Sequence, residues 1–192
     1  MSWLQQRTRL QRAAREVDPA IRLYNKDNWF CKLLAGLLFL VSFGNMKPDE
    51  FLHRFATTIG PFQFYPEYWS TRSVEAVLFH ESRHTRQARW FGLWIHPWVG
   101  LPLYGLLYLF APLPLGFAWL RFWFELDADR FAWRKSLKTG LVDTHAVTTR
   151  AARFSRTLCS YKYVWPIPRC WGVPLFEEAA GRVCAEHEKH NE

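Results

Sequence analysis

The stretch 90–120 constrains the fold of this chain more than any other, because its 31 residues include no charged side chain when His96 is counted as neutral. A run of this kind lies either in lipid or in a protein core. Prolines interrupt it at positions 97, 102, 112 and 114. Two crossings of a bilayer would leave about 15 residues for each, roughly 22 Å of helix against a hydrocarbon core of about 30 Å. If the residues on either side of the run share one site, as the motifs that flank it suggest, the run is predicted to be a bent apolar hairpin that is either packed in a core or half-inserted in a membrane.

The sequence His80-Glu81-Ser82-Arg83-His84, which has the form HExxH, lies just before this run. Residues four apart on an α-helix project from one face, about 6 Å apart along the axis, so two imidazoles can share one Zn²⁺ ion. Glu81 is rotated by about 100° from His80, beside the ion, where it can take a proton from a metal-bound water. Because such a short pattern also arises by chance, the hypothesis needs a further ligand elsewhere in the chain.

A candidate third ligand occurs in the sequence Glu125-Leu126-Asp127-Ala128-Asp129. Gln87 and Trp90 stand where the extended metzincin pattern has glycine and histidine, which excludes that class. Glu125 can supply the carboxylate and leave one coordination position open. Asp129, one helical turn further, can accept the remaining N–H of a ligating histidine. The two motifs can share an ion only if 90–120 does not cross a bilayer once, since a single crossing would separate them.

HExxH followed by Glu-x-x-Ala-Asp on a later helix resembles the gluzincin peptidases of the CAAX prenyl protease and heat-shock membrane endopeptidase group. It is similar, more loosely, to small zincin-like proteins of bacterial and phage genomes. The resemblance covers these two helices only. It implies that His80, His84 and Glu125 are zinc ligands. It also implies that Glu81 is the general base and that Asp129 orients a ligand. Arg83 departs from the family's usual uncharged residue and the spacer between the motifs is short, so no substrate preference carries over.

The other segments predict helices and one small β element. Residues 3–24 predict a basic helix that breaks or ends near Pro19. The apolar segment 29–43 is too short to span a bilayer and predicts a buried or interfacial helix. Residues 55–66 carry β-branched and aromatic side chains around Gly60-Pro61, which is typical of a hairpin or an edge strand.

Further helices are expected over 70–90, 117–138 and 143–158, the last with Asp143 as its cap, and a final helix has Pro174 near its start. The predicted fold class is α+β, mostly α, in a single zincin-like domain over 1–192. Its minimal core consists of the motif helix, the Glu-bearing helix and the β-hairpin or edge strand.

The net charge of +8 suits an anionic membrane surface or nucleic acid, but no zinc-finger spacing or RNP-like motif supports nucleic acid. The four cysteines never form Cys-x-x-Cys, which favours reduced side chains over a cysteine zinc site, with a Cys159–Cys170 disulfide as the alternative. The first 28 residues are too long and charged for an ordinary secretory signal. The expected location is the cytoplasm. Peripheral or monotopic attachment to the inner face of the membrane is the further possibility that these features leave open.

Three functions compete on these observations. The first is a zinc-dependent peptidase, a hydrolase in which Glu81 acts as general base on a peptide or protein substrate added as a strand along 62–65. His145, Tyr161 and Tyr163 are its candidate oxyanion donors, with His145 placed first. The alternative is a non-catalytic zinc-stabilised module for binding, including binding to a membrane surface. In the third, HExxH is accidental in a basic binding protein.

Overall fold

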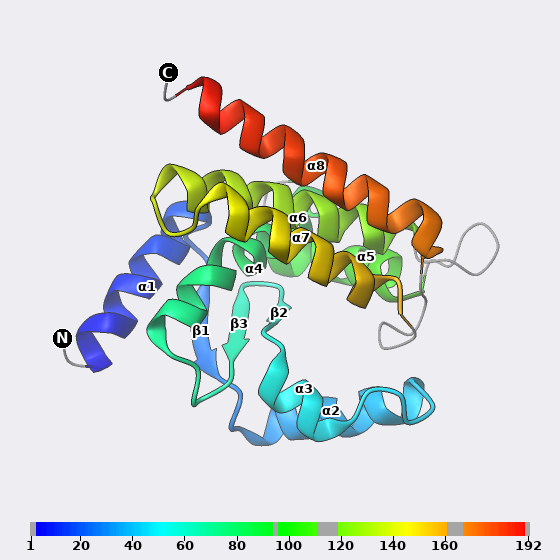
Figure 1. Cartoon of the computed structure of the whole chain (residues 1–192). Helices are drawn as coiled ribbons and strands as arrows, with labels where there is room; N and C mark the ends of the chain where they lie inside the picture. The colour runs from blue at the N-terminus through cyan, green and yellow to red at the C-terminus, as the bar shows by residue number, and fades with distance from the viewer. Residues whose placement is uncertain (1–2, 94–95, 111–118, 161–166, 191–192) are drawn as a thin grey trace. The chain divides into compact units, whose positions relative to one another are not determined.

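The computed structural model of the chain describes residues 3–93, 96–110, 119–160 and 167–190 (Figure 1). It divides into two compact units, Met1–Tyr104 and Gly105–Glu192. The structure is 71% helical with a small three-stranded sheet, which confirms the predicted α+β, mostly α class. The single zincin-like domain over 1–192 stays a prediction.

The sheet of the first unit has the strand order β1-β3-β2 (Figure 1). β2 (Thr57–Ile59) and β3 (Phe62–Tyr65) form the predicted antiparallel hairpin. Gly60 makes the turn with a φ of +57°, a left-handed conformation that favours glycine. β1 (Arg22–Asn25) pairs in parallel with the other side of β3.

The N-terminal helix, α1 (Trp3–Val17), ends near Pro19, as predicted. The sequence predictions are wrong at two points of the sheet. Residues 22–24, which lie within the predicted helix 3–24, belong to β1 instead. As a result, β3 over 62–65 is the central strand and cannot accept an added strand as predicted. The physical reason is long-range: β1 is stabilised by hydrogen bonds to a strand about 40 residues away, which a local pattern does not reveal.

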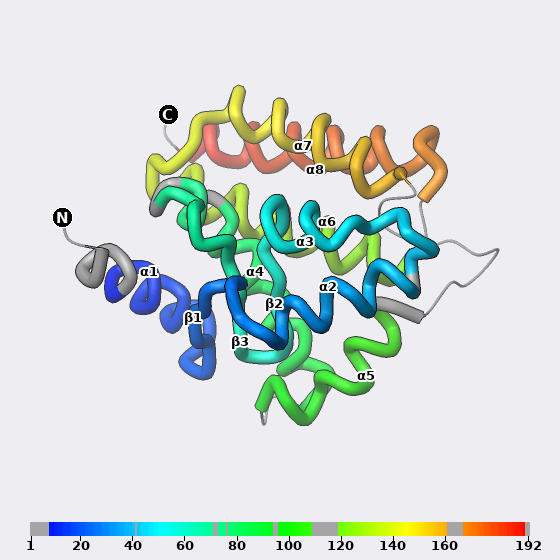
Figure 2. The backbone as a smooth tube through the Cα atoms, turned by 90° about the horizontal axis from the view of Figure 1, so that it is seen from below, coloured from blue at the N-terminus to red at the C-terminus, as the bar shows by residue number. Residues whose placement is uncertain are grey.

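The first unit has three more helices. They are α2 (Trp29–Val41), α3 (Pro48–Arg54) and α4 (Thr71–Phe91). α2 and α3 lie side by side (Figure 2), and α4 contacts β2, β3 and α1. The Ser70 side chain caps α4 by accepting from the Ser73 N–H, so the predicted start and end of the motif helix are confirmed. A buried core of Ala14, Ile21, Leu23, Tyr65 and Leu78 holds α1, β1, β3 and α4 together.

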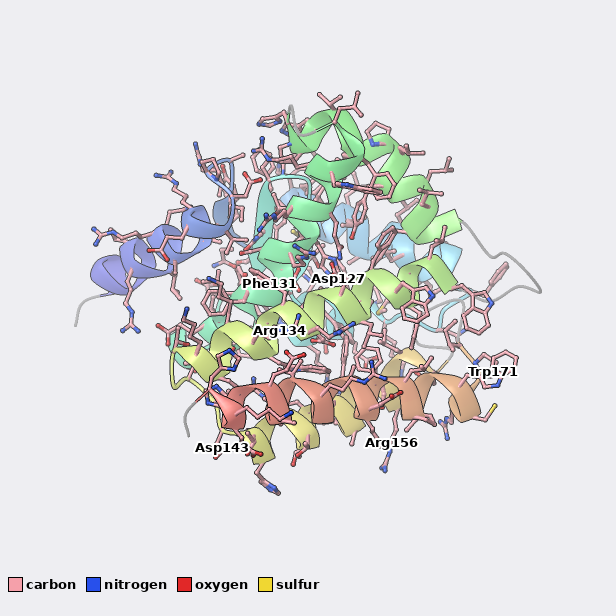
Figure 3. The ribbon with its side chains drawn as sticks, turned by 90° about the horizontal axis from the view of Figure 1, so that it is seen from above. Asp127, Phe131, Arg134, Asp143, Arg156 and Trp171 are labelled. Carbon is pink, nitrogen blue, oxygen red and sulfur yellow. The ribbon has the colours of Figure 1, made fainter. Side chains whose placement is uncertain are left out.

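The second unit consists mainly of α6 (Trp119–Lys138), α7 (Thr144–Leu158) and α8 (Arg169–Lys189). α6, which carries the labelled Arg134, runs beside α8 in Figure 3. Arg134 forms an ion pair with Glu186 of α8 at 2.9 Å. The shared core of the two helices includes Phe122, Trp133 and Phe176. The predicted C-terminal end of α6 and both predicted limits of α7 are confirmed; the predicted start of α6 at 117 lies outside the described residues. α8 begins at Arg169, so Pro174 lies inside it and not near its first residue.

The uncharged stretch 90–120 contains the end of α4, the helix α5 (Pro97–Phe110) and the first residues of α6. Residues 94–95 and 111–118 lie outside the described residues, so the predicted hairpin is described only in part. Pro102 lies within α5. Over the described ranges, none of the helices is both long and apolar enough to cross a membrane. All four cysteines are free, so the Cys159–Cys170 disulfide is not formed.

Candidate metal centre

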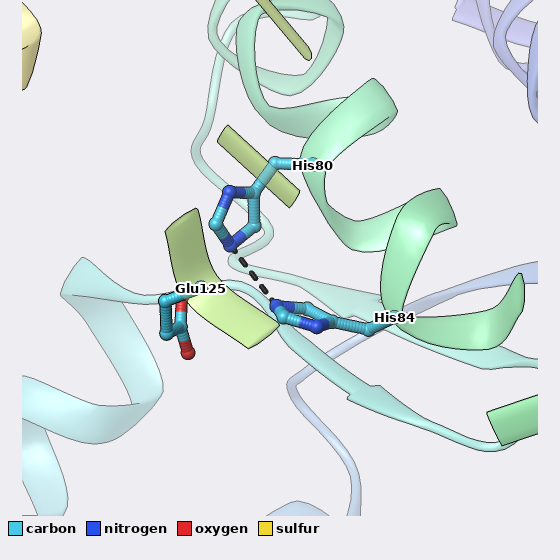
Figure 4. Close-up of side chains that lie close together, drawn as sticks. All are labelled: His80, His84 and Glu125. Atoms are coloured by element: carbon cyan, nitrogen blue, oxygen red, sulfur yellow. Dashed lines mark hydrogen bonds between the residues drawn. The ribbon is translucent and has the colours of Figure 1, made fainter. Parts of the chain in front are cut away.

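The two histidines of the HExxH motif face one another on α4. Their Nε2 atoms are 3.1 Å apart, and the ring centroids are separated by 4.8 Å with the rings nearly perpendicular (Figure 4). Two nitrogens bound tetrahedrally to one zinc ion at about 2.0–2.1 Å would lie about 3.3 Å apart. The spacing of His80 and His84 is that of a hydrogen bond between the two rings. It is also close to the spacing of two ligands of one ion, so the pair is compatible with the predicted metal site.

The other ring nitrogen of His84 is held by two buried polar side chains. Its Nδ1 lies 2.9 Å from Oε1 of Gln87 and 3.0 Å from the hydroxyl of Tyr104. The Tyr104 hydroxyl also donates to the same Gln87 oxygen, at 3.1 Å. Because that amide oxygen can only accept, His84 donates from Nδ1, and its Nε2 keeps the lone pair that a metal needs. This arrangement orients the ring in the way that hydrogen bonds beyond the ligands do in metal sites.

The Glu81 carboxylate is anchored to the edge of the sheet. Thr58 on β2 donates its hydroxyl to Oε2 of Glu81 at 2.6 Å, and the Glu81 residue is buried. A hydroxyl has one proton to donate, so this bond fixes the carboxylate while its second oxygen can accept from another group. The predicted general base thus has a defined orientation beside His80.

Two further polar contacts fix α4 on the sheet. Gln63 on β3 donates to the hydroxyl of Ser82 at 3.2 Å, and Thr85 donates to the carbonyl of Gly60 at 2.9 Å. All these groups are buried, so each bond also satisfies a polar atom that would be costly to leave alone. The small polar residue at position 82 of the motif is explained by this contact with the central strand.

Lys26, at the end of β1, is buried in the same unit. Its ammonium donates to the carbonyl of Phe51 at 2.7 Å and lies 3.7 Å from the centre of the Phe51 ring. Burial lowers the pKa of Lys26 to about 8, against the opposing effect of the negative charge of Glu81. Burial, with the Glu81 charge as a second cause, raises the pKa of Tyr65 well above its usual value. The charge of Glu81 therefore acts on buried groups of this unit.

In the second unit, Glu125 lies on α6 with only 2% of its surface exposed. The Tyr108 hydroxyl donates to its Oε1. The Tyr108 ring is itself held between the parallel ring of Phe124 and the guanidinium of Arg121, 4.8 Å from the ring centre. Asp129 follows one turn later and is half-buried. A carboxylate removed from water in this way requires hydrogen bonds or a cation.

His145, the favoured oxyanion donor in the sequence analysis, is exposed in the first turn of α7. Its backbone carbonyl accepts a hydrogen bond from Thr148 at 2.9 Å. Its catalytic role stays a prediction. Tyr161 and Tyr163, the other two candidates, lie outside the described residues.

Sequence reasoning missed four residues that position the candidate ligands and base: Thr58, Gln87, Tyr104 and Tyr108. Gln87 could have been found, because a residue three positions after a helical ligand lies beside it. The others contact residues 17 or more positions away. No local pattern signals such contacts.

Comparison of the chain with family models, curated proteins and solved structures finds no match.

Proposed function

We propose that this chain is a zinc-dependent peptidase in which His80, His84 and Glu125 bind the metal ion and Glu81 is the general base. The observation that carries the proposal is the 3.1 Å separation of the two Nε2 atoms, with the proton of His84 directed away to Gln87. Glu125, which belongs to the second unit, is the proposed third ligand. Two imidazoles and a carboxylate are a donor set typical of catalytic zinc.

The chain's own residues supply the acid–base chemistry. A bound zinc ion would contribute Lewis acidity toward the scissile carbonyl and toward water. Glu81, held at one oxygen by Thr58, uses the other to accept the proton of the attacking water and then returns it to the leaving amine. The carboxylate needs no reorientation between the two transfers, because the bond to β2 fixes it.

The edge strand β2 is the proposed binding strand for the peptide. β2 takes the role that the sequence analysis gave to residues 62–65, because those residues form the central strand β3. β2 pairs with β3 along one side, and Thr58 places the strand directly beside Glu81. A peptide added to the other side of β2 by backbone hydrogen bonds would therefore run past the general base.

Asp129 has a narrower proposed role than the motif alone suggests. Since the Nδ1 of His84 is already bonded to Gln87, the histidine that remains for Asp129 is His80. The half-buried carboxylate would accept from the His80 ring and orient it, as Gln87 does for His84.

Elemental analysis combined with a peptide-cleavage assay tests the proposal. The wild type should contain one zinc per chain and cleave peptide, while Glu81→Gln should keep the metal and lose at least about 100-fold in rate. Glu125→Ala should lose both metal and activity. Glu67 is an exposed glutamate in the same unit as Glu81, so Glu67→Gln is the matched control and should behave as wild type.

Each alternative function gives its own result in this experiment. Stoichiometric zinc without any turnover in the wild type would identify a non-catalytic, zinc-stabilised module. Absence of zinc from the purified wild type would mean that HExxH is accidental in this chain. Full activity of Glu81→Gln would refute the role given to that carboxylate.

A further inference from the structure

One side of α2 exposes large apolar side chains to solvent. Trp29, Leu33, Leu37 and Leu40 are between 56% and 76% exposed, and their spacing of four, four and three residues places them on one face of the helix. Phe43, two residues beyond the end of the helix, is 95% exposed. A soluble surface seldom gathers so many large apolar groups, and such a patch commonly marks an interaction site.

The backbone at Phe43 adds an independent sign of function. Its φ is 52°, in the left-handed region that costs a residue with a side chain roughly 1–2 kcal/mol. Glycine or asparagine would relieve this strain and would also remove an exposed aromatic ring. Strain kept together with an unfavourable exposed side chain points to a role outside the fold itself.

A row of aromatic rings connects this helix to the sheet. Phe30 on α2 contacts Phe64, Tyr24 contacts both Phe64 and Phe62, and Phe62 contacts Trp98 on α5, with ring centres 5.3–5.9 Å apart. These rings lie on the face of the sheet opposite α4, because side chains alternate along β3 and Gln63 points to α4. Tyr24 and Trp98 are both more than 40% exposed, so the row reaches solvent.

We call the joined surface the aromatic platform. It comprises the exposed side of α2 and the row of rings across the sheet: Tyr24, Trp29, Phe30, Leu33, Leu37, Leu40, Phe43, Phe62 and Trp98. Phe64 links these rings but is itself buried. Two exposed cations accompany it, Lys32 on α2 and Arg22 two residues before Tyr24 on the same face of β1. Lys32 pairs with Asp27 at 2.8 Å. The whole chain carries a net charge of +8.

We infer that the aromatic platform docks on the surface of a lipid bilayer that contains anionic lipids. The leucines would enter the boundary of the acyl chains, while tryptophan and tyrosine lie at the level of the headgroups. Lys32 and Arg22 would be attracted by the lipid phosphates. A second copy of the chain fits this surface less well than a membrane does. A twofold contact of the aromatic platform with itself would bring the same cations together.

Vesicle co-sedimentation of the full chain tests the inference, using phosphatidylcholine vesicles and vesicles of phosphatidylcholine mixed with phosphatidylglycerol. The wild type should bind the anionic vesicles more strongly, and added salt should weaken that binding. Leu37→Glu and Leu40→Glu should each reduce the partition constant by about tenfold or more. Both positions are exposed, so the substitutions leave the core of the unit unchanged.

Three comparisons keep the result specific. Trp29→Ala should weaken vesicle binding, whereas Trp171→Ala, an exposed tryptophan on α8 (Figure 3), should not. Glu81→Gln should bind vesicles as the wild type does, because docking does not depend on the proposed zinc site. Light scattering after size exclusion reports the oligomeric state of each variant.

Two outcomes would overturn the inference. One is a wild type that sediments with neither kind of vesicle, or variants of α2 that bind as well as the wild type. The other is a dimer that Leu40→Glu dissociates while vesicle binding is unchanged, which would identify the platform as an interface between copies of the chain.

Discussion

At the scale of single residues, the candidate centre depends on side chains that are not themselves ligands. Gln87 and Tyr104 determine which nitrogen of His84 carries the proton, and Thr58 determines how the Glu81 carboxylate is turned. Each acts through hydrogen bonds in a largely buried setting, where the loss of such bonds is costly. These residues can therefore be tested separately from the ligands.

Replacing Gln87 with leucine should weaken metal binding without removing a ligand. The variant removes one of the two partners of the His84 Nδ1 and leaves only the Tyr104 hydroxyl, so the ring is less well oriented, and we expect about 10–100-fold lower zinc affinity. Competition with a chromophoric chelator measures this affinity. Gln87→Glu keeps an acceptor at the same place and should bind zinc more tightly than Gln87→Leu. Equal affinities for the leucine variant and the wild type would contradict the role of Gln87.

Lys26 should give the stability of the protein a distinct dependence on pH. Its pKa is lowered to about 8 from 10.5 in the unfolded chain, so the cost of burying the charge is fully present below pH 8 and is relieved as the pH rises through this window. Relative to Lys26→Met, the wild type should gain about 3 kcal/mol in free energy of unfolding between the two pKa values.

Urea unfolding of the wild type and Lys26→Met across this pH range measures the difference. Comparing the two proteins cancels other groups that titrate in the same range and do not interact with Lys26, including Tyr65 and Cys159, whose pKa values are raised. A difference that does not change with pH would mean that Lys26 is not buried as a charged group.

At the scale of elements, α4 is held by contacts at both ends and along one face. Ser70 caps its start, Ser82 and Thr85 bond to the sheet, and Arg89 near its end forms an ion pair with Asp18. Asp18 follows α1, so the pair joins the end of one helix to the end of the other. The motif histidines lie between these fixed points, which accounts for the defined geometry of their rings.

Asp18→Ala should destabilise the protein strongly. Asp18 is 2% exposed, and it accepts from Nη2 of Arg89 at 2.7 Å and from the N–H of Ala20 at 2.9 Å. Removing one member of a largely buried pair leaves the other uncompensated, at a cost of about 3 kcal/mol. The midpoint of denaturant unfolding measures the loss. Asp49→Ala, which removes an exposed pair with His53, is the control and should leave the midpoint unchanged.

At the scale of the whole molecule, the proposed metal would link residues of two compact units. The histidines belong to the first unit and Glu125 to the second. A ligand that binds only the folded chain stabilises it in proportion to the logarithm of its concentration relative to its dissociation constant. Metal binding is therefore expected to be visible in the stability of the complete chain and not only in its activity.

Removal of the metal should lower the thermal midpoint of the wild type. With free zinc at about 100 times its dissociation constant, the bound ion would contribute about 2.7 kcal/mol, which a chelator removes. Calorimetry with and without chelator measures the shift. Glu125→Ala should show a much smaller shift, and an equal shift in that variant would argue that Glu125 is not a ligand.

The limits of several helices could be predicted because their signals are local. Ser70 and Asp143 cap α4 and α7 with their own side chains, and Gly140, with a φ of +67°, lies just after α6. Each signal acts over three or four residues, within reach of the pattern itself. The spacing of His80 and His84 belongs to the same class, since the helix alone brings the two rings together.

Pairing and burial could not be predicted in this way. Whether 22–25 continues a helix or forms a strand depends on hydrogen bonds to 62–65, and that pairing in turn makes β3 central and β2 the edge beside Glu81. Likewise, the apolar pattern of α2 is equally consistent with a buried and an exposed helix.

The sequence by itself therefore determined the motif helix, its two facing imidazoles and the mostly helical class, because these follow from periodicity and caps within a few turns. Only the tertiary structure decided the order of the strands, the partners that orient His84 and Glu81, and the exposure of α2. Those features arise from contacts between segments far apart in the chain, whose energies depend on which surfaces meet and not on the neighbours in sequence.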